Sequence, residues 1–243
     1  MKKKFLLPIL SVCMVVALVS VGFAAWLITG NHTKEAQGQF VTYDVQNNYF
    51  SVTAVEKDST KITFGKDGSP INPWLTVSDV ADQVLTKTFT ITITPEIPFA
   101  DGRTVSTLLG TDVVKVKLSG LAKDQTTETE GSTAKLYAAA VTNGILGNPS
   151  IESGSIKSTS GDLTNGVEIR LPAGSFNVQT DNATAIAEVK VTFAWGTNGN
   201  PYTYYNGLEN NAEHRDAATT ALGLVQVLNT KLYYIYLEVG AAS

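Results

Sequence analysis

Few residues of this 243-residue chain have the types and spacing of an active site. A zinc protease needs two histidines one helical turn apart, with a glutamate beside the first. The chain has two histidines, His32 and His214, and Arg215 and Asp216 follow the second one. No Gly-x-Ser-x-Gly elbow is present for a serine nucleophile. We therefore expect no catalytic residue, no metal ligand and no cofactor, and a protein that is not an enzyme.

Carboxylates are plentiful but scattered along the chain. A glycosidase needs two of them facing each other across a cleft, and sequence alone cannot bring a pair together. A secreted hydrolase therefore stays as a third interpretation of the function.

Aromatic residues crowd one stretch rich in amides, between Trp195 and Asn206. Flat rings stack on sugar faces and Asn amides bond hydroxyls, so the stretch could form a carbohydrate-binding or partner-binding surface. Alternatively, it covers one end of the domain with its rings packed inward. We prefer this second interpretation. The candidate ligand surface consists of Trp195, Tyr202, Tyr204 and Tyr205.

The first residues read as a secretory signal peptide. Three lysines precede an apolar run from Phe5 to Phe23, and the small residues Gly22 and Ala24 fit a signal peptidase. We expect cleavage between Ala24 and Ala25, which makes the protein secreted and a signal peptidase its first partner. The apolar run is about as long as a membrane-spanning helix, so an uncleaved anchor is the alternative.

The amino-acid composition argues against nucleic acid as a partner and against disulfide bonds. Without the three lysines of the leader, the mature chain has 15 basic and 22 acidic residues, a net charge of −7. No cluster of Lys and Arg follows the leader, which argues against nucleic acid as a partner. The single cysteine, Cys13, lies in the leader. The mature protein can therefore form neither a disulfide nor a cysteine-ligated metal site.

Strand patterns dominate the remaining sequence. Thr86–Thr94 alternates Phe or Ile with Thr, which is typical of a half-buried strand. Lys231–Val239 is apolar on both faces, which predicts a central or helix-covered strand. Similar alternation predicts further strands at Gln39–Val45, Tyr49–Val55, Lys61–Phe64, Val113–Leu118, Lys135–Val141, Val167–Leu171 and Ile186–Trp195.

Helical spacing is rarer. Apolar residues recur at threes and fours over Ala212–Leu228, and a shorter helix is predicted at Thr104–Leu109, closed by Gly110. Asn47-Asn48 predicts a tight turn, and the polar stretches Lys123–Ser132 and Asn148–Asn165 predict loops. The whole pattern predicts an all-β fold: a jelly-roll-type β-sandwich with one or two short helices, after an N-terminal signal helix. We expect a signal peptide (1–24), a flexible N-terminal segment (25–38) and one domain (39–243).

The leader and its junction resemble those of the TasA/camelysin family of Firmicutes. The resemblance lies in Gly22-Phe23-Ala24-Ala25-Trp26, a polar spacer and the strand-like Gln39–Val45. It implies a SipW-type signal peptide. The late stretch Val189–Gly196, with Asn200-Pro201 and Tyr204-Tyr205-Asn206 after it, is similar to uncharacterised exported proteins with this kind of leader.

The resemblance implies a jelly-roll protein of the cell surface or biofilm matrix of a Gram-positive bacterium. TasA-like subunits form fibres when the N-terminal segment of one subunit adds as a strand to the next, so the expected partner is a second copy. The freed segment is apolar and β-prone, as β-augmentation requires: Ala25, Trp26, Leu27, Ile28 and Thr29. Some camelysin relatives are classed as metallopeptidases, but the sequence supplies no ligand motif for that activity. The alternative function is an adhesive module that binds matrix polysaccharide or cell wall.

Overall fold

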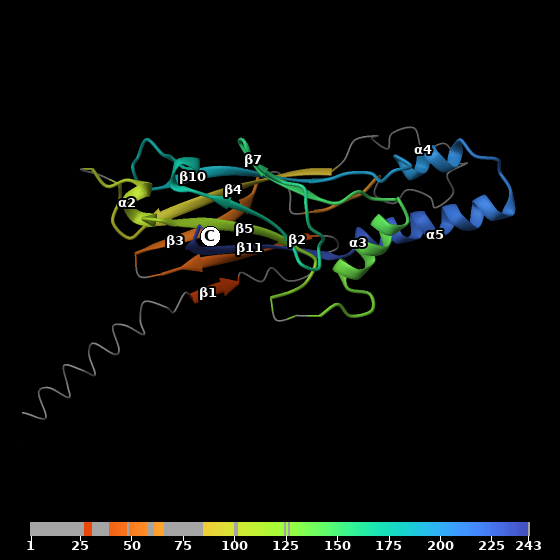
Figure 1. Cartoon of the computed structure of the whole chain (residues 1–243), viewed down its shortest axis with the longest axis horizontal. Coiled ribbons are helices and arrows are strands. Elements are labelled where there is room, and N and C mark those ends of the chain that lie inside the picture. The colour runs from red at the N-terminus through yellow and green to blue at the C-terminus, as the bar shows by residue number, and fades with distance from the viewer. Residues whose placement is uncertain are drawn as a thin grey trace, which may run out of the picture.

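The computed structural model describes residues 27–30, 39–47, 49–57, 61–65, 85–99, 102–123, 125 and 127–242, with the backbone alone for 27–30. The predicted signal helix, the cleavage residues Ala24 and Ala25, and Trp26 lie outside the described residues. All the strands of the described residues belong to one large sheet (Figure 1). This confirms the all-β class.

Eleven strands form this sheet within the described residues. They are β1 (Leu27–Gly30), β2 (Gln39–Gln46), β3 (Phe50–Glu56), β4 (Leu85–Pro95), β5 (Asp112–Ser119), β6 (Ser150–Ser153), β7 (Ile156–Ser158), β8 (Val167–Leu171), β9 (Asn177–Val178), β10 (Ala185–Phe193) and β11 (Leu232–Ala241).

Nine strands follow one another in the order β7-β6-β10-β4-β3-β2-β11-β5-β8, while β1 pairs with β2 and β9 with β10. The pairing of β11 with β2 is parallel, and the other pairings are antiparallel. The two end strands, β7 and β8, contact each other. The sheet is therefore nearly closed around its core.

Alternation along β4 shows why these residues form strands. Phe89, Ile91 and Ile93 are fully buried, whereas the threonines between them are partly exposed. A strand turns successive side chains to opposite faces, so every second residue enters the core. Strand β10 pairs with β4 along its whole length and repeats the pattern.

Aromatic rings fill the core beside these strands. Phe40 contacts Phe89 edge-on at 4.9 Å between ring centroids, and Phe193 meets Tyr233 in the same way at 5.4 Å. Such pairs add about 0.5–1.5 kcal/mol each beyond the area they bury. Packing of this kind stabilises residues 39–243, which contain no cysteine for a disulfide.

Four α-helices and one 3₁₀ turn complete the described fold. They are α2 (Val105–Leu109), α3 (Thr133–Thr142), α4 (Pro201–Asn206), α5 (Ala212–Leu228) and the 3₁₀ turn η1 (Ala173–Ser175). Figure 1 shows α3, α4 and α5 at one end of the sheet and α2 at the other. The prediction of one or two short helices was therefore too low.

Helix α5 has the predicted bounds. Its first turn is capped by Asn211, whose side-chain oxygen accepts a hydrogen bond from the backbone N–H of His214. The helix buries a stripe of apolar residues at helical spacing: Ala218, Ala221, Leu222, Val225 and Leu228. The stripe fixes which face of α5 covers the core.

Two predictions are confirmed by hydrogen bonds: the short helix closed by Gly110 and the tight turn at Asn47-Asn48. Thr104 and Thr107 form a reciprocal capping pair at the start of α2, which Gly110 ends with a positive φ of 61°. The Asn47 side chain accepts hydrogen bonds from the N–H groups of Tyr49 and Phe50, which closes the turn between β2 and β3.

The strand predicted at Lys135–Val141 is wrong, because this segment is helix α3. The Ser132 side chain accepts from the backbone N–H of Lys135 and caps the helix. Three consecutive alanines, Ala138–Ala140, favour a helix strongly. An apolar run of this length fits both the two-residue period of a strand and the 3.6-residue period of a helix, and the cap at Ser132 favours the helix.

Three further segments differ from the predictions. Asn148–Asn165, predicted as a loop, contains the hairpin of β6 and β7. Lys61–Phe64, predicted as a strand, makes one isolated bridge between Lys61 and Gln39. The predicted loop after Trp195 contains α4, with Pro201 at its start. Short elements of this kind carry too few residues for a periodic signal.

Candidate functional site

Strand β1 contains three residues of the predicted assembly strand. Leu27, Ile28 and Thr29 lie in β1 with Gly30, and the strand runs antiparallel to β2. The paired residues are Leu27 and Gln46, Ile28 and Val45, Thr29 and Asp44, and Gly30 and Tyr43. The other two residues of the predicted strand, Ala25 and Trp26, lie outside the described residues.

Strand β2 shares its two edges among three partners. Strand β11 pairs with Gln39–Tyr43, β3 pairs with Val45 and Gln46, and β1 pairs with Tyr43–Gln46. A strand has two edges, so β1 must lie opposite β3, on the edge that β11 leaves after Tyr43. Without β1, the last residues of β2 would present unpaired backbone groups on this edge. We call the edge of Tyr43–Gln46 that β1 occupies the β1 groove.

Asp44 lies in the β1 groove at an irregular point of β2. Phe40 and Val45 both belong to the core, although an odd separation puts two residues of a regular strand on opposite faces. Asp44 Oδ1 accepts a hydrogen bond of 3.2 Å from the backbone N–H of Ala54 on β3. Burial raises the pKa of the Asp44 carboxyl, and the hydrogen bond from Ala54 opposes part of that rise. The side chain therefore ties β2 to β3 beside their short ladder.

Three tyrosines form a cluster on β2 and β11. Tyr43 stacks on Tyr236 at 4.8 Å between centroids, and Tyr234 lies 6.1 Å from Tyr43 and 6.2 Å from Tyr236. The Tyr236 hydroxyl donates to the Leu121 carbonyl at 2.6 Å. Burial, and Tyr43 to a smaller extent, raise the pKa of Tyr234. This tyrosine cluster begins opposite Gly30 of β1, because Gly30 pairs with Tyr43.

Sequence reasoning missed the tyrosine cluster. Tyr43 is separated from Tyr234 and Tyr236 by about 190 residues of chain, and the parallel pairing of β2 with β11 brings them together. The only sequence signal was the apolar character of both faces of Lys231–Val239. That signal correctly predicted a central strand, since β11 lies between β2 and β5.

The predicted aromatic ligand surface is divided between the core and α4. Trp195 packs against the core and bridges to Leu146. Tyr202 is 4% exposed, so its ring has little surface to offer a ligand.

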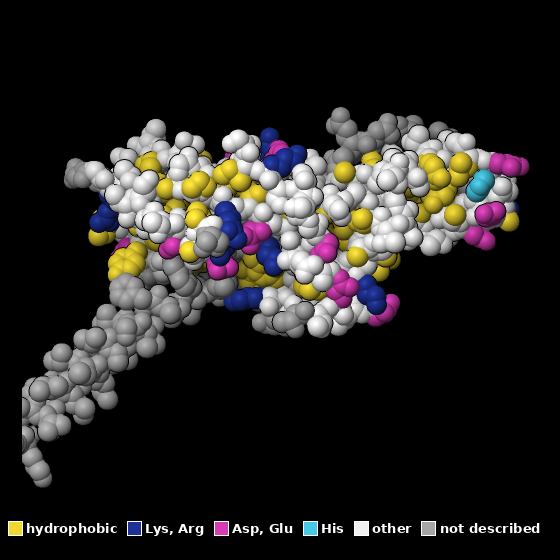
Figure 2. Space-filling model, in the orientation of Figure 1, with side chains coloured by type: hydrophobic (Ala, Val, Ile, Leu, Met, Phe, Trp, Pro, Cys, Tyr) yellow, Lys and Arg dark blue, Asp and Glu magenta, His cyan; other side chains and the backbone are white. Residues whose placement is uncertain are grey.

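The other two rings follow Tyr202 on the same helix, α4. Tyr204 is 37% exposed and meets Tyr205 edge-on at 5.1 Å. Burial, and Tyr204 to a smaller extent, raise the pKa of Tyr205. Figure 2 shows hydrophobic side chains over α4 and α5, beside the one histidine drawn. The exposed aromatic surface of this stretch is therefore smaller than the sequence suggests.

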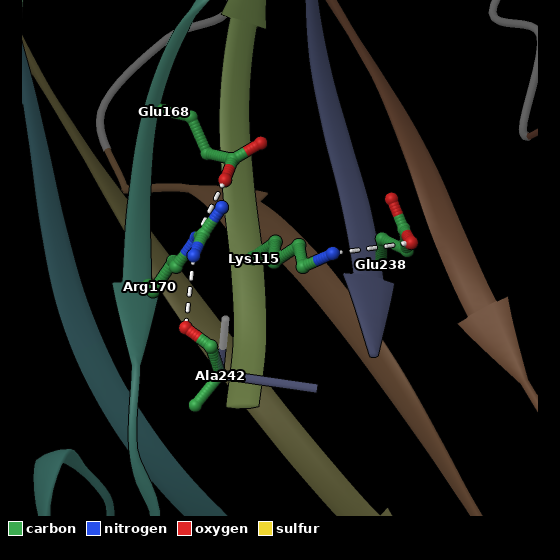
Figure 3. Close-up of polar contacts among 5 residues, drawn as sticks. All are labelled: Lys115, Glu168, Arg170, Glu238 and Ala242. Carbon is green, nitrogen blue, oxygen red and sulfur yellow. Dashed lines mark hydrogen bonds and ion pairs between the residues drawn. The ribbon is translucent and has the colours of Figure 1, made fainter. Parts of the chain in front are cut away.

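Four charged side chains lie close together on the neighbouring strands β11, β5 and β8 (Figure 3). Lys115 pairs with Glu238 at 3.5 Å, and Arg170 pairs with Glu168 at 3.0 Å. Arg170 also donates to the carbonyl of Ala242 at 2.8 Å, which holds the chain end against β8. Exposed pairs of this kind contribute about 0–1 kcal/mol each. They mark a solvated face.

The described residues contain no group of three or more His, Cys, Asp and Glu that could hold a metal ion. His214, the histidine they include, lies in the first turn of α5, and its Nδ1 is 2.7 Å from the carbonyl oxygen of Glu209. Within the same residues, no helix is both long and apolar enough to span a membrane.

Comparison with known proteins identifies no relative. No family model matches the chain, and no curated protein or solved structure gives a significant match.

Proposed function

We propose that this protein is an exported, non-enzymatic structural subunit of cell-surface or biofilm-matrix fibres. The N-terminal strand of one copy occupies the β1 groove of the next. The observation that supports this proposal most directly is the ladder between β1 and β2, because it shows a segment of the predicted kind fitting this edge. Signal peptidase cleavage before Ala25 would free that segment.

The geometry of β1 suits exchange between copies. Strand β1 has four residues and pairs with β2, to which residues 31–38 join it. A strand held by one ladder within its own chain can form the same ladder with a second copy, as in domain swapping. Each copy then fills one groove and offers its own, so the contacts run head to tail. Such contacts extend into filaments when their rotation does not close a ring.

Energetics also favour exchange over a permanent intramolecular strand. A backbone hydrogen bond contributes about 0.5–1.5 kcal/mol net, so a four-residue ladder is worth a few kcal/mol. Unfolding a whole domain costs about 5–15 kcal/mol. Strand β1 can therefore leave the β1 groove while the rest of the sheet stays folded.

The finer topology belongs to this proposal as well. We assign the domain a jelly-roll-type sandwich, and the nearly closed sheet supports this, since β7 and β8 at its two ends contact each other. Closure of this kind leaves few free edges. It makes the β1 groove the natural acceptor for a strand from another copy.

A cysteine pair tests the exchange directly. Residues 25–243 contain no cysteine, so Leu27→Cys with Gln46→Cys, which are paired across the ladder, supplies the only two thiols. Under oxidising, fibre-promoting conditions we expect a ladder of disulfide-linked oligomers on non-reducing gels and filaments by electron microscopy. The control pair Leu27→Cys with Ser51→Cys, which uses the neighbouring strand β3, should give far fewer oligomers.

A truncated chain supplies the complementary test. Residues 31–243 lack β1 and should stay monomeric, as measured by light scattering. Filaments formed by this truncated chain would contradict the proposal. So would a Leu27→Cys, Gln46→Cys product that is a disulfide-closed monomer under the same conditions.

A further inference from the structure

A cavity of about 330 Å³ opens beside the N-terminus of α3 and the start of β11. It brings together parts of the chain that are distant in sequence: the segment before α3, and the link from α5 into β11. The lining residues that matter here are Thr129, Ser132, Thr230, Lys231 and Tyr234. Ligand pockets in proteins begin at about this size.

Tyr234 gives the cavity a flat aromatic wall. Among the three residues of the tyrosine cluster, Tyr234 is the one that lines the cavity. Its centroid lies 6.1 Å from that of Tyr43 and 6.2 Å from that of Tyr236, so both neighbours hold its ring in place. Tyr236 is itself fixed by its hydrogen bond to Leu121. The ring of Tyr234 is therefore held in position without a ligand.

Apart from Tyr234, the lining is mostly polar: it includes hydroxyl groups, the Lys231 ammonium group, the Glu130 carboxylate and the Gln125 amide. Ser132 Oγ accepts from the N–H of Lys135, so its own hydrogen is free to donate. Thr230 Oγ1 donates to the carbonyl of Val227, so its lone pairs are free to accept. Thr129 adds a hydroxyl and Lys231 a cationic donor. The lining thus offers both hydrogen-bond donors and acceptors beside one aromatic residue.

We propose that this cavity binds one sugar residue of a polysaccharide. A pyranose has an apolar face that stacks on a flat ring, and a rim of hydroxyls that both donate and accept hydrogen bonds. The cavity supplies both kinds of contact. A lipid or another apolar ligand would require a mainly apolar lining, which these hydroxyl and ammonium groups do not provide.

This sugar site differs from the surface predicted around Trp195, and it does not depend on the proposed fibre assembly. The cavity is formed by residues of α3, its preceding segment and β11, whereas the β1 groove is formed by Tyr43–Gln46. A monomeric form without β1 should therefore bind sugar as well as the longer chain does.

Titration calorimetry with defined oligosaccharides tests the site. The probes are cellopentaose, laminaripentaose, chitopentaose and an oligogalacturonate, so that neutral, N-acetylated and acidic sugars are compared. We expect at least one of them to bind residues 31–243, and Tyr234→Ala to weaken that binding roughly tenfold, as loss of one aromatic contact allows. Thr129→Leu, which places a branched apolar side chain at the cavity from an exposed position and adds no ring, should also weaken it. Tyr204→Ala on α4 should leave the affinity unchanged.

Failure of all four sugars to bind the folded protein would overturn the sugar site. Binding that survives Thr129→Leu unchanged, or that is lost in Tyr204→Ala and not in Tyr234→Ala, would overturn it equally. Circular dichroism of each variant separates lost binding from lost folding. Should Tyr234→Ala fail to fold, Thr129→Leu decides the question alone.

Discussion

The pKa of the Asp44 carboxyl depends on its position in the fold. Burial raises the pKa of its carboxyl above the ordinary value of about 3.9. An acid whose folded-state pKa is raised contributes stability below its unfolded pKa, and this contribution is lost as pH rises through the folded pKa. At neutral pH the charged Asp44 is therefore a cost to the fold.

We predict that Asp44→Asn makes the protein more stable at pH 7. The amide keeps an oxygen that can accept from the N–H of Ala54, and it carries no charge to desolvate. The advantage over the wild type should shrink as pH falls through the raised folded-state pKa of Asp44, and it should be smallest below the ordinary pKa of about 3.9. Urea unfolding of the wild type and of Asp44→Asn, at pH 3 and at pH 7, measures the free energies of unfolding to be compared. A variant that is less stable than the wild type at pH 7 would contradict the assigned cause of the pKa rise.

Glu56 and Lys87 form a second informative pair. The Glu56 side chain is 1% exposed and that of Lys87 10%, and Lys87 Nζ lies 3.5 Å from Glu56 Oε1. Among the described residues, neither carboxylate oxygen of Glu56 has a hydrogen-bond partner. Removing the cation would leave a buried, uncompensated charge.

Lys87→Met should therefore cost about 3–5 kcal/mol of stability. The double variant Lys87→Met, Glu56→Leu should recover most of this loss, because it removes both charges. Lys57→Met is the matched control, since Lys57 pairs with Glu188 at an exposed site and should cost at most about 1 kcal/mol. Denaturant unfolding of the four proteins gives the comparison. Equal losses of stability for Lys57→Met and Lys87→Met would contradict the prediction that breaking the buried pair costs more than breaking the exposed one.

At the scale of elements, caps and periodicity determine what forms. Helix α5 begins where Asn211 accepts from the N–H of His214. We predict that Asn211→Ala costs about 1 kcal/mol of stability, measured by chemical denaturation. Asn210→Ala, next to it but outside the cap, should stay within about 0.5 kcal/mol of the wild type. A larger loss for Asn210→Ala would place the start of the helix elsewhere.

Long periodic elements could be predicted from sequence, and short or ambiguous ones could not. The alternation of Thr86–Thr94 and the stripe of Ala212–Leu228 identify β4 and α5, because each repeats over several turns or pleats. Lys135–Val141 fits both periods, and only the cap at Ser132 resolves it as a helix. The β6–β7 hairpin is too short and too rich in Ser and Gly for its period to show.

The candidate site was predictable in part. Leu27–Thr29 could be assigned as a strand because the segment is apolar and β-prone, but nothing local indicates that its partner is β2. The tyrosine cluster and the cavity beside Tyr234 depend on a parallel pairing across nearly the whole chain. Side chains assembled by such distant contacts leave no mark in a local pattern.

At the scale of the whole molecule, stability should be unevenly distributed. Strand β1 rests on one four-residue ladder, whereas β4 pairs along its length with β3 and β10 around fully buried rings. We predict that amides of Leu27–Gly30 exchange with solvent by local opening, at least about a hundredfold faster than those of Phe89, Ile91 and Ile93. Native-state hydrogen exchange measures this difference. Equal protection of the two strands would mean that β1 is an integral part of the sheet and does not exchange.

The position of β11 has a consequence for how the chain acquires its fold. The last strand in sequence lies in the middle of the sheet, where it joins β2 on one side to β5 on the other. Until residues 232–241 are available, the two halves of the sheet share no ladder across this position. A chain delivered N-terminus first would therefore not complete this sheet until residues 232–241 had emerged, and it would then fold slowly through contacts of very high sequence separation. Deletion of residues 232–243, which removes β11, should abolish the fold, and circular dichroism measures this.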